Sequence, residues 1–247
     1  MPGAEPAAGH WHAMEEEAVQ RTVRVMARAL ARAGLSGAYG HCSMRLNADS
    51  FLVCAARPMG LIRPGDAGTV VPVHGPLPPG VLGEVRLHQQ LYDRRPHVRA
   101  VCRFISANVV ALAATGRTVR PRTGFGSYFF PQVPFWGDPQ LVRSDELARR
   151  VIELMGDAWG VIVNVNGAVV AAETPERALT LAWNLEEAAR VELAVLASGL
   201  EDNAPLFSEQ AARERAVWDG RIAERLWDYL TDGDPEAEAI GSHSGNA

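Results

Sequence analysis

The stretch "GEVRLHQQLYDRRPHVRAVCRFIS", residues 83–106, combines an amphipathic helix with a strand that follows it closely. Apolar residues recur at helical spacing over 83–96. The inward side of this helix is predicted to carry Val85, Leu87 or His88, Leu91 and Tyr92. The segment 98–104, "VRAVCRF", predicts a buried strand. Arg103 is its exception, because a guanidinium inside a buried strand must be paired or must bind an anion.

Helices and strands alternate on both sides of this stretch. The predicted elements are a helix at 14–34, strands at 42–47, 50–55 and 68–73, a helix at 107–116, a strand pair at 159–172 around a turn at Asn166–Gly167, and helices at 174–199 and 208–230. Thr174 before Pro175 is a typical helix start. The order predicts an α/β (α+β) fold, with one mostly antiparallel sheet covered by helices on both faces.

The domain organisation follows from the same pattern. We expect a flexible tail at 1–13, one domain at 14–200, a C-terminal helical extension at 201–232, and a disordered tail at 233–247 that is rich in Gly, Ser, Asp and Glu. The final helix carries Val217, Ile222, Leu226, Trp227 and Tyr229. These side chains form either a partner surface or a face that packs on the chain's own domain or a sister subunit.

Composition excludes several classes of function. The 247 residues contain no run of 18 apolar residues and begin without a basic, then apolar, leader, so we expect neither a membrane span nor secretion but a cytoplasmic protein. The net charge of −5, with basic residues spread along the chain, gives nucleic-acid binding no support. All 24 basic residues are arginine, which excludes chemistry at a lysine amine. Three cysteines without a CxxC pair predict reduced thiols.

Four stretches in order resemble one known family. "GAYGHCSMRL" is similar to G-N-x-S-x-R, "LIRPGD" to L-x-P-E-D, and the opening stretch to S-E-x-x-x-H-x-x-[IL]-Y-x-x-R-P-D-x-x-A-V-x-H-x-H-S. "VIVNVNGAVVAAETPERALTLAWNLEEAA" is similar to L-x-x-N-H-G followed by a helix. Together they cover about residues 15–200 and resemble the class II aldolase/adducin family. The resemblance implies a single class II aldolase-like domain and a homo-oligomer.

The departures from the family pattern concern its metal site. The resemblance implies three metal-binding histidines, two from H-x-H and one from N-H-G. This chain has Arg103, Ile105 and Asn166 at those positions, and neither a guanidinium nor an alkyl chain offers a lone pair to zinc. We therefore expect no metal and no cofactor. A displaced site built from His41, His74 and His88 is the alternative, although their spacing matches no ligand motif.

The family's phosphate-binding residues are also replaced. The T-P-S-G stretch of sugar-phosphate aldolases becomes "CAAR" at 54–57, and the S-S before the glutamate becomes Leu82-Gly83. Neither replacement predicts a phosphate cradle. We expect a small-molecule substrate of a different kind.

Five residues are candidates for chemistry at the altered site. By resemblance, Glu84 stands at the family's acid/base glutamate, and it otherwise reads as a carboxylate favoured at a helix start. Arg103 either supplies a fixed cation for catalysis or makes a buried ion pair. Arg57 binds a substrate carboxylate or is a solvated loop residue. His74 relays protons or lies in a surface turn. His88 helps bind and orient groups near Glu84, or belongs to the core.

An aromatic segment completes the candidate site. Residues 122–136 hold six of the 17 aromatic residues, and Gly124 and Gly126 predict a mobile loop. We expect Phe125, Tyr128 and Phe129 to line a substrate site for a flat molecule that carries a carboxylate. The alternative is a core strand with a hydrophobic lid.

Two classes of function fit these residues. The first is a metal-independent enzyme that makes or breaks carbon–carbon bonds. Within it, the order of Arg57, His74 and Glu84 resembles bacterial Pictet–Spenglerases, which condense tryptophan with an aldehyde to a β-carboline. A metal-free lyase, decarboxylase or isomerase would use the same residues. The second class is a non-catalytic interaction module similar to the adducin head, which should have a filled cavity.

Overall fold

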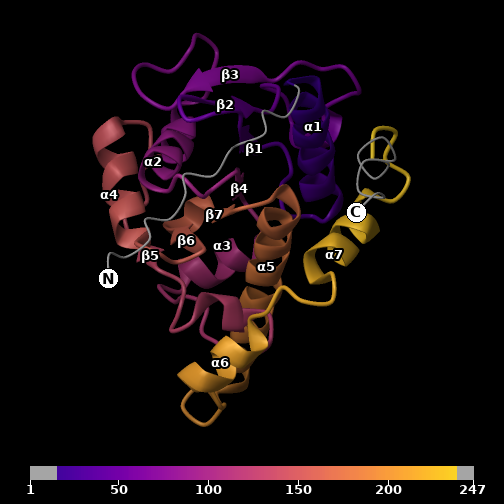
Figure 1. The fold of residues 1–247 in the computed structure, drawn as a ribbon. Helices are drawn as coiled ribbons and strands as arrows, with labels where there is room; N and C mark the ends of the chain where they lie inside the picture. Colours follow the sequence, from indigo (N-terminus) through magenta and orange to yellow (C-terminus); the bar gives the residue numbers. More distant parts are fainter. Residues whose placement is uncertain (1–15, 238–247) are drawn as a thin grey trace, which may run out of the picture.

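The computed structural model describes residues 16–237, so the tail predicted at 1–13 lies outside the described residues. Within these residues, seven strands form one sheet in the order β3-β2-β1-β4-β7-β6-β5 (Figure 1). They are β1 (Gly40–Arg45), β2 (Ser50–Val53), β3 (Thr69–Pro72), β4 (Ala100–Phe104), β5 (Phe135–Trp136), β6 (Gly160–Val163) and β7 (Ala168–Ala172). Neighbours pair antiparallel except for β5 and β6, which are parallel.

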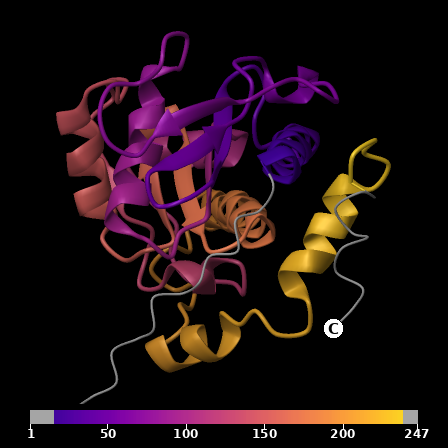
Figure 2. The ribbon, with the colours of Figure 1, turned by 45° about the horizontal axis from the view of Figure 1, so that its top comes forward.

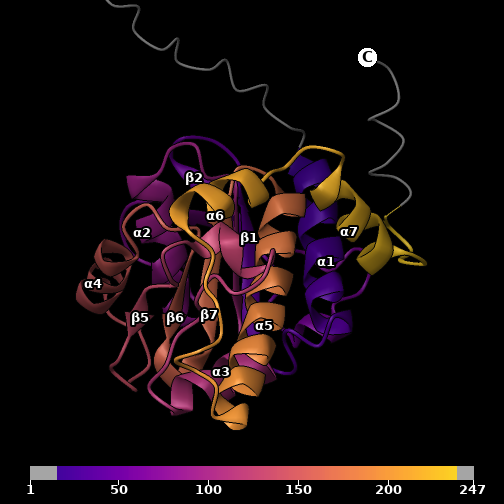
Figure 3. The same ribbon diagram turned by 90° about the horizontal axis from the view of Figure 1, so that it is seen from below.

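Helices cover both faces of the sheet, as predicted (Figure 3). They are α1 (Glu16–Arg32), α2 (Arg86–Arg94), α3 (Ala107–Ala114), α4 (Asp145–Met155), α5 (Pro175–Ser198), α6 (Glu209–Arg215) and α7 (Ile222–Thr231). The described residues also form four short 3₁₀ turns: η1 (Met59–Leu61), η2 (Gly83–Val85), η3 (Gly126–Phe129) and η4 (Asn164–Asn166). The predicted start of α5 is confirmed, since the Thr174 hydroxyl accepts a hydrogen bond from the Arg177 amide. No helix of the described chain is both long and apolar enough to cross a bilayer.

Two hydrophobic cores lie on opposite faces of the sheet, because successive side chains of a strand point to opposite faces. In β4, Cys102 and Phe104 belong to the core under α1, α3 and α5. Val101 belongs to the core under α2 and α4. Arg103 shares the face of Val101, so it projects toward the side of the sheet that α2 and α4 cover.

The C-terminal segment differs from the prediction. The single helix expected at 208–230 is two helices, and the chain between them turns at Gly220, whose positive φ of 69° favours glycine. Helix α7 packs beside α1 and α5 (Figure 2), with Trp227 and Leu230 buried in their core. The sequence left open whether this helix forms a partner surface or packs on its own domain or a sister subunit. Trp227 and Leu230 pack on their own domain.

The disorder predicted from residue 233 is wrong for its first residues. Asp234 accepts hydrogen bonds from Arg28, and Glu236 accepts them from Arg24 and Arg28. Asp234 is buried. Residues 233–237 are therefore bound to α1 by a buried ion-pair network, which composition alone does not reveal. The remainder of that predicted tail lies outside the described residues.

Candidate active site

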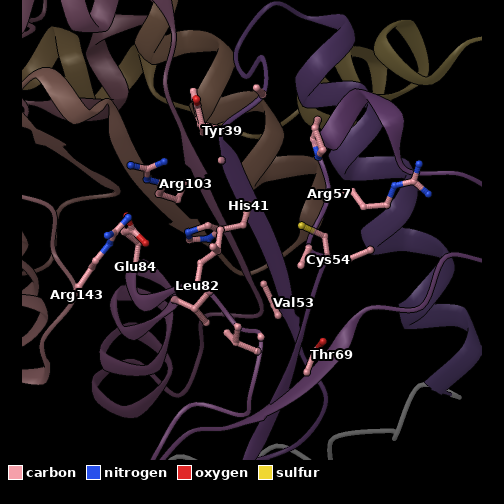
Figure 4. A pocket seen from close by; sticks show the side chains of 18 residues that line it. Tyr39, His41, Val53, Cys54, Arg57, Thr69, Leu82, Glu84, Arg103 and Arg143 are labelled. Atoms are coloured by element: carbon pink, nitrogen blue, oxygen red, sulfur yellow. The ribbon is translucent and has the colours of Figure 1, made fainter.

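A cavity of about 340 Å³ opens beside the ends of β1 and β4 and is closed by the segments 54–58 and 80–85. Its volume lies in the range of small-molecule sites. One part of the wall is apolar and includes Val53, Cys54, Ala55, Val81 and Leu82. The other part is charged or polar and includes His41, Arg57, Glu84, Arg103 and Arg143 (Figure 4). Three of the predicted site residues thus share one cavity.

Strand register places His41 and Arg103 side by side. The antiparallel pairing of β1 with β4 sets His41 opposite Arg103, and side chains opposite one another in such a pair are neighbours on one face. Arg103 is only 7% exposed, and its Nη2 donates a hydrogen bond to the Asn166 carbonyl oxygen at 3.2 Å. Burial lowers the pKa of Arg103, whereas the nearby Glu84 carboxylate raises it. The guanidinium remains a cation at neutral pH.

Glu84 lies between two arginines. It sits in η2, just before α2, and is 8% exposed. Its Oε1 accepts a hydrogen bond from Arg143 Nε at 3.2 Å. Figure 4 shows the Glu84 carboxylate beside Arg143, with the Arg103 side chain directed toward the same region. The carboxylate therefore pairs with the solvent-facing Arg143 and interacts electrostatically with the buried Arg103.

Arg143 is a site residue that the sequence pattern did not single out. It immediately precedes Ser144, whose hydroxyl accepts a hydrogen bond from the Leu147 amide and so caps α4. The residues "SDE" at 144–146 are a recognisable helix start, and they could have located α4 and its flanking arginine. Gly83 makes room for Arg143, because an added Cβ would lie 2.9 Å from the Arg143 Cγ. Packing thus explains why this chain has Leu82-Gly83 where the family pattern has S-S.

Arg57 lies at the edge of the cavity, and His88 lies behind it. Arg57 lines the cavity but pairs with Asp66 at 2.9 Å, and in Figure 4 its guanidinium points away from Glu84. His88, on α2, is completely buried, and its Nε2 lies 2.9 Å from Nδ1 of His41. His88 therefore reaches the cavity only through His41.

His74 does not join the cavity of Glu84. It follows β3, its side chain is 71% exposed, and its Nε2 lies 3.8 Å from Asp93 Oδ1. It borders a separate depression next to Arg45 and Tyr92. The nine residues between His74 and Glu84 include Gly75 and Gly80, whose positive φ angles mark turns of the chain. The prediction that His74 and Glu84 act together is not met by this geometry.

The aromatic segment also lies elsewhere. Phe129 is buried in the core shared with α5. Tyr128 donates a hydrogen bond to the Val217 carbonyl oxygen at 2.6 Å, and its ring packs on Trp218. Phe125 is 42% exposed and lies outside the cavity. The expected aromatic wall is therefore not assembled in the single chain, because η3 turns these rings toward α5 and α6. The core interpretation fits Phe129.

The residues present do not fit a metal ion. Arg103 takes one ligand position of the resemblance, and the Asn166 side chain is engaged with the Pro139 carbonyl oxygen at 2.9 Å. The imidazoles of His41 and His88 are directed at one another. Within residues 16–237, no three His, Cys, Asp or Glu side chains are grouped closely enough to hold a metal. Metal independence stays a prediction that rests on this donor set.

Comparison with known proteins identifies the family. The sequence profile of the Class II Aldolase and Adducin N-terminal domain matches residues 21–193. The chain belongs to this family. An aldolase II superfamily protein from Pseudomonas syringae shares the fold, with a TM-score of 0.73 over 95% of this chain and 96% of that one, at 18% identity. The expected class II aldolase-like fold is confirmed.

Curated relatives within the family are named as decarboxylases. The 3,4-dihydroxyphthalate decarboxylase of Rhodococcus jostii (strain RHA1) is 29% identical over 189 residues, which cover 69% of this chain and 77% of the relative. The enzyme of the same name from Arthrobacter keyseri is 29% identical over 208 residues, which cover 76% of this chain and 83% of the relative. The comparisons give the resemblance to Pictet–Spenglerases no support.

Proposed function

We propose that this chain is a decarboxylase that removes CO₂ from a small hydroxylated aromatic carboxylate. The observation that carries the proposal is the meeting of the buried Arg103 cation and the Glu84 carboxylate in one largely apolar cavity. The names of the relatives, all 3,4-dihydroxyphthalate decarboxylases, point to the same reaction class. The names of the relatives favour the lyase and decarboxylase alternative over Pictet–Spengler condensation.

The charged part and the apolar part of the cavity wall have different roles in this reaction. Arg103 binds an anionic group of the substrate, since a guanidinium can donate two parallel hydrogen bonds to a carboxylate. The apolar wall at Cys54, Ala55 and Leu82 receives the carboxylate that leaves. A charge is disfavoured in such surroundings, whereas neutral CO₂ is not. A substrate with a second anionic group beside the leaving carboxylate fits this division best.

Glu84 supplies the proton that the reaction consumes. Its carboxylate takes up a proton from solvent and passes it to the ring carbon that bears the substrate carboxylate, and a ring hydroxyl stabilises the resulting non-aromatic intermediate. The bond to the carboxylate then breaks, its electron pair returns to the ring, and CO₂ departs. Glu84 regains its proton from solvent, which reaches it beside Arg143, whose side chain is 61% exposed. General acid catalysis of this kind contributes about 10²- to 10⁴-fold to the rate.

The interaction-module alternative predicts a filled cavity. The cavity is instead open, and it keeps a buried acid and a buried cation at its wall. Replacing buried charges of this kind with apolar residues is often neutral or stabilising, so their retention beside an open cavity favours a ligand-binding, catalytic role. This supports the enzyme class without identifying the substrate.

The test is CO₂ release from a panel of hydroxylated aromatic mono- and dicarboxylates, with tryptophan plus an aldehyde as the competing reaction. We expect CO₂ release from at least one dicarboxylate. Glu84→Gln should lower the rate by at least about 10²-fold while leaving the melting temperature unchanged within 2–3 °C, a tolerance of roughly 1 kcal/mol. Glu153→Gln, which changes a carboxylate that does not line the cavity, should retain full activity. β-Carboline formation without CO₂ release would refute the proposal.

A further inference from the structure

Four buried polar side chains form a continuous hydrogen-bonded chain behind the cavity. His41 Nδ1 lies 2.9 Å from His88 Nε2, and His88 Nδ1 lies 2.6 Å from Ser43 Oγ. Ser43 Oγ lies 2.9 Å from the Tyr92 hydroxyl oxygen. None of the four residues is more than 3% exposed. Because β1 carries His41 and Ser43 while α2 carries His88 and Tyr92, the chain also fixes the helix to the strand.

One end of this chain is free at the cavity. His41 lines the cavity, and in Figure 4 its ring is directed toward Glu84 and Arg103. Its Nε2 is buried and has no hydrogen-bond partner among residues 16–237. A buried polar atom without a partner is unfavourable, and native proteins rarely keep one without a function. The nitrogen therefore points to a ligand atom in the cavity.

The surroundings of His41 keep it uncharged. Burial, His88 and Arg103 together lower the pKa of His41 well below its ordinary value. Burial and Arg103 lower the pKa of His88 to about 3. At neutral pH each imidazole thus has one N–H and one bare nitrogen.

The hydrogen bonds of the chain can run in either direction. In one direction, His41 Nδ1–H donates to His88 and each next group donates onward, so that Nε2 accepts a hydrogen bond from the cavity. In the other direction, Tyr92 donates to Ser43, Ser43 to His88, and His88 to His41, so that Nε2–H donates into the cavity. The Tyr92 hydroxyl can end the first arrangement at the Arg99 carbonyl oxygen, 3.5 Å away.

We propose that His41 Nε2 recognises a hydroxyl group of the substrate and thereby makes the site selective for hydroxylated carboxylates. This inference rests on the proposed function and adds the residue that chooses the substrate. A second carboxylate would call for a cation, and an ammonium group would be repelled by Arg103. A hydroxyl oxygen suits a neutral imidazole in both directions of the chain, whether the oxygen carries its proton or has become carbonyl-like during decarboxylation. Ser43, His88 and Tyr92 act as positioning residues.

The test measures binding rather than turnover. Isothermal titration calorimetry at pH 7.5 compares benzoate with its 2-, 3- and 4-hydroxy isomers. In the wild-type protein, at least one isomer should bind about tenfold more tightly than benzoate, a difference of 1.4 kcal/mol. In His41→Phe this preference should fall to about twofold or less while benzoate affinity is retained. Arg103→Met should weaken all four ligands and leave their ratio unchanged.

A second measurement uses the wild-type protein and so does not depend on a variant's folding. In ¹⁵N-histidine NMR spectra, the preferred isomer should shift Nε2 of His41, and benzoate should not. Tyr92→Phe, which removes only the far hydroxyl, should reduce the preference without abolishing benzoate binding. An unchanged preference in His41→Phe, or equal Nε2 shifts with benzoate and the hydroxylated ligand, would overturn the inference.

Failure of the inference and failure of the proposed function can be told apart. A His41-dependent preference without CO₂ release from any substrate would leave the inference standing and refute decarboxylation. CO₂ release from hydroxylated substrates, with the same preference among them and the same affinity in wild type and His41→Phe, would do the reverse.

Discussion

Replacing Arg103 with methionine tests which of two candidate arginines, Arg103 or Arg57, binds the substrate carboxylate. Methionine has a similar length and no charge, so Arg103→Met removes the buried cation with little change in volume. Arg103 is 7% exposed, and a hydrogen bond to a charged group in such surroundings contributes about 1.5–3 kcal/mol. Affinity for an aromatic carboxylate should therefore fall by about 10- to 150-fold.

Arg57→Met is the matched comparison. The Arg57 side chain is 39% exposed and already pairs with Asp66. Exposed ion pairs contribute about 0–1 kcal/mol, which limits the loss to about fivefold. Calorimetric titration with the ligand found in the CO₂ assay measures both variants, and their melting temperatures show whether each is folded. A larger loss for Arg57→Met than for Arg103→Met would refute the assignment of the carboxylate to the buried cation.

Further predictions concern stability, pH, metal and assembly. Arg45→Met should lower the free energy of unfolding by about 2–4 kcal/mol, because Arg45 donates to the carbonyl oxygens of Val98 and Tyr92 inside the protein; the exposed Arg213→Met should change it by less than about 0.5 kcal/mol in the same denaturant titration. Burial raises the pKa of Asp234, but hydrogen bonds from Arg28 and other contacts lower it more, so its folded pKa lies below the ordinary 3.8. The resulting stabilisation is complete at neutral pH and is lost as the pH falls through the folded pKa, so Asp234→Asn should flatten the acid limb of a plot of melting temperature against pH; an identical acid limb would contradict the pairing. Treatment with a chelator should change neither melting temperature nor activity, and one tightly bound zinc per chain by elemental analysis would contradict metal independence. Light scattering should show a homo-oligomer, as the family resemblance implies; a monomer would contradict it.

Local patterns predict much of this fold. The helical spacing over 83–96 and the apolar run of 98–104 locate α2 and β4 because burial on one side leaves a period in the sequence. Thr174 and Pro175 mark the start of α5 because the cap is a contact between near neighbours. Arg103 is also recognised from a local pattern, because it is a charged residue in an otherwise apolar strand. Glu84 is located by family resemblance rather than by periodicity.

Local patterns do not predict contacts between segments that are distant in the sequence. Arg143 reaches Glu84 across 59 residues of sequence, and no local pattern encodes that approach. His74 lies ten residues before Glu84, yet the intervening turns take it to another depression. Aromatic residues fill cores and line sites alike, so composition could not tell which of these Phe129 would do. The pairing of His41 with His88 depends on how α2 packs against β1.

The polar side chains on one face of β1 and β4 also bear on how this sheet can evolve. Ser43 lies opposite Val53 and Val101, and Arg103 lies opposite Val169 and His41. Valine at these sites would suit a buried, pleated surface better, so random change under selection for stability alone would erase them one by one. If a consensus sequence of the family is used to stabilise this protein, these three positions should be inspected first. A single substitution there would improve folding and remove substrate selectivity at the same time.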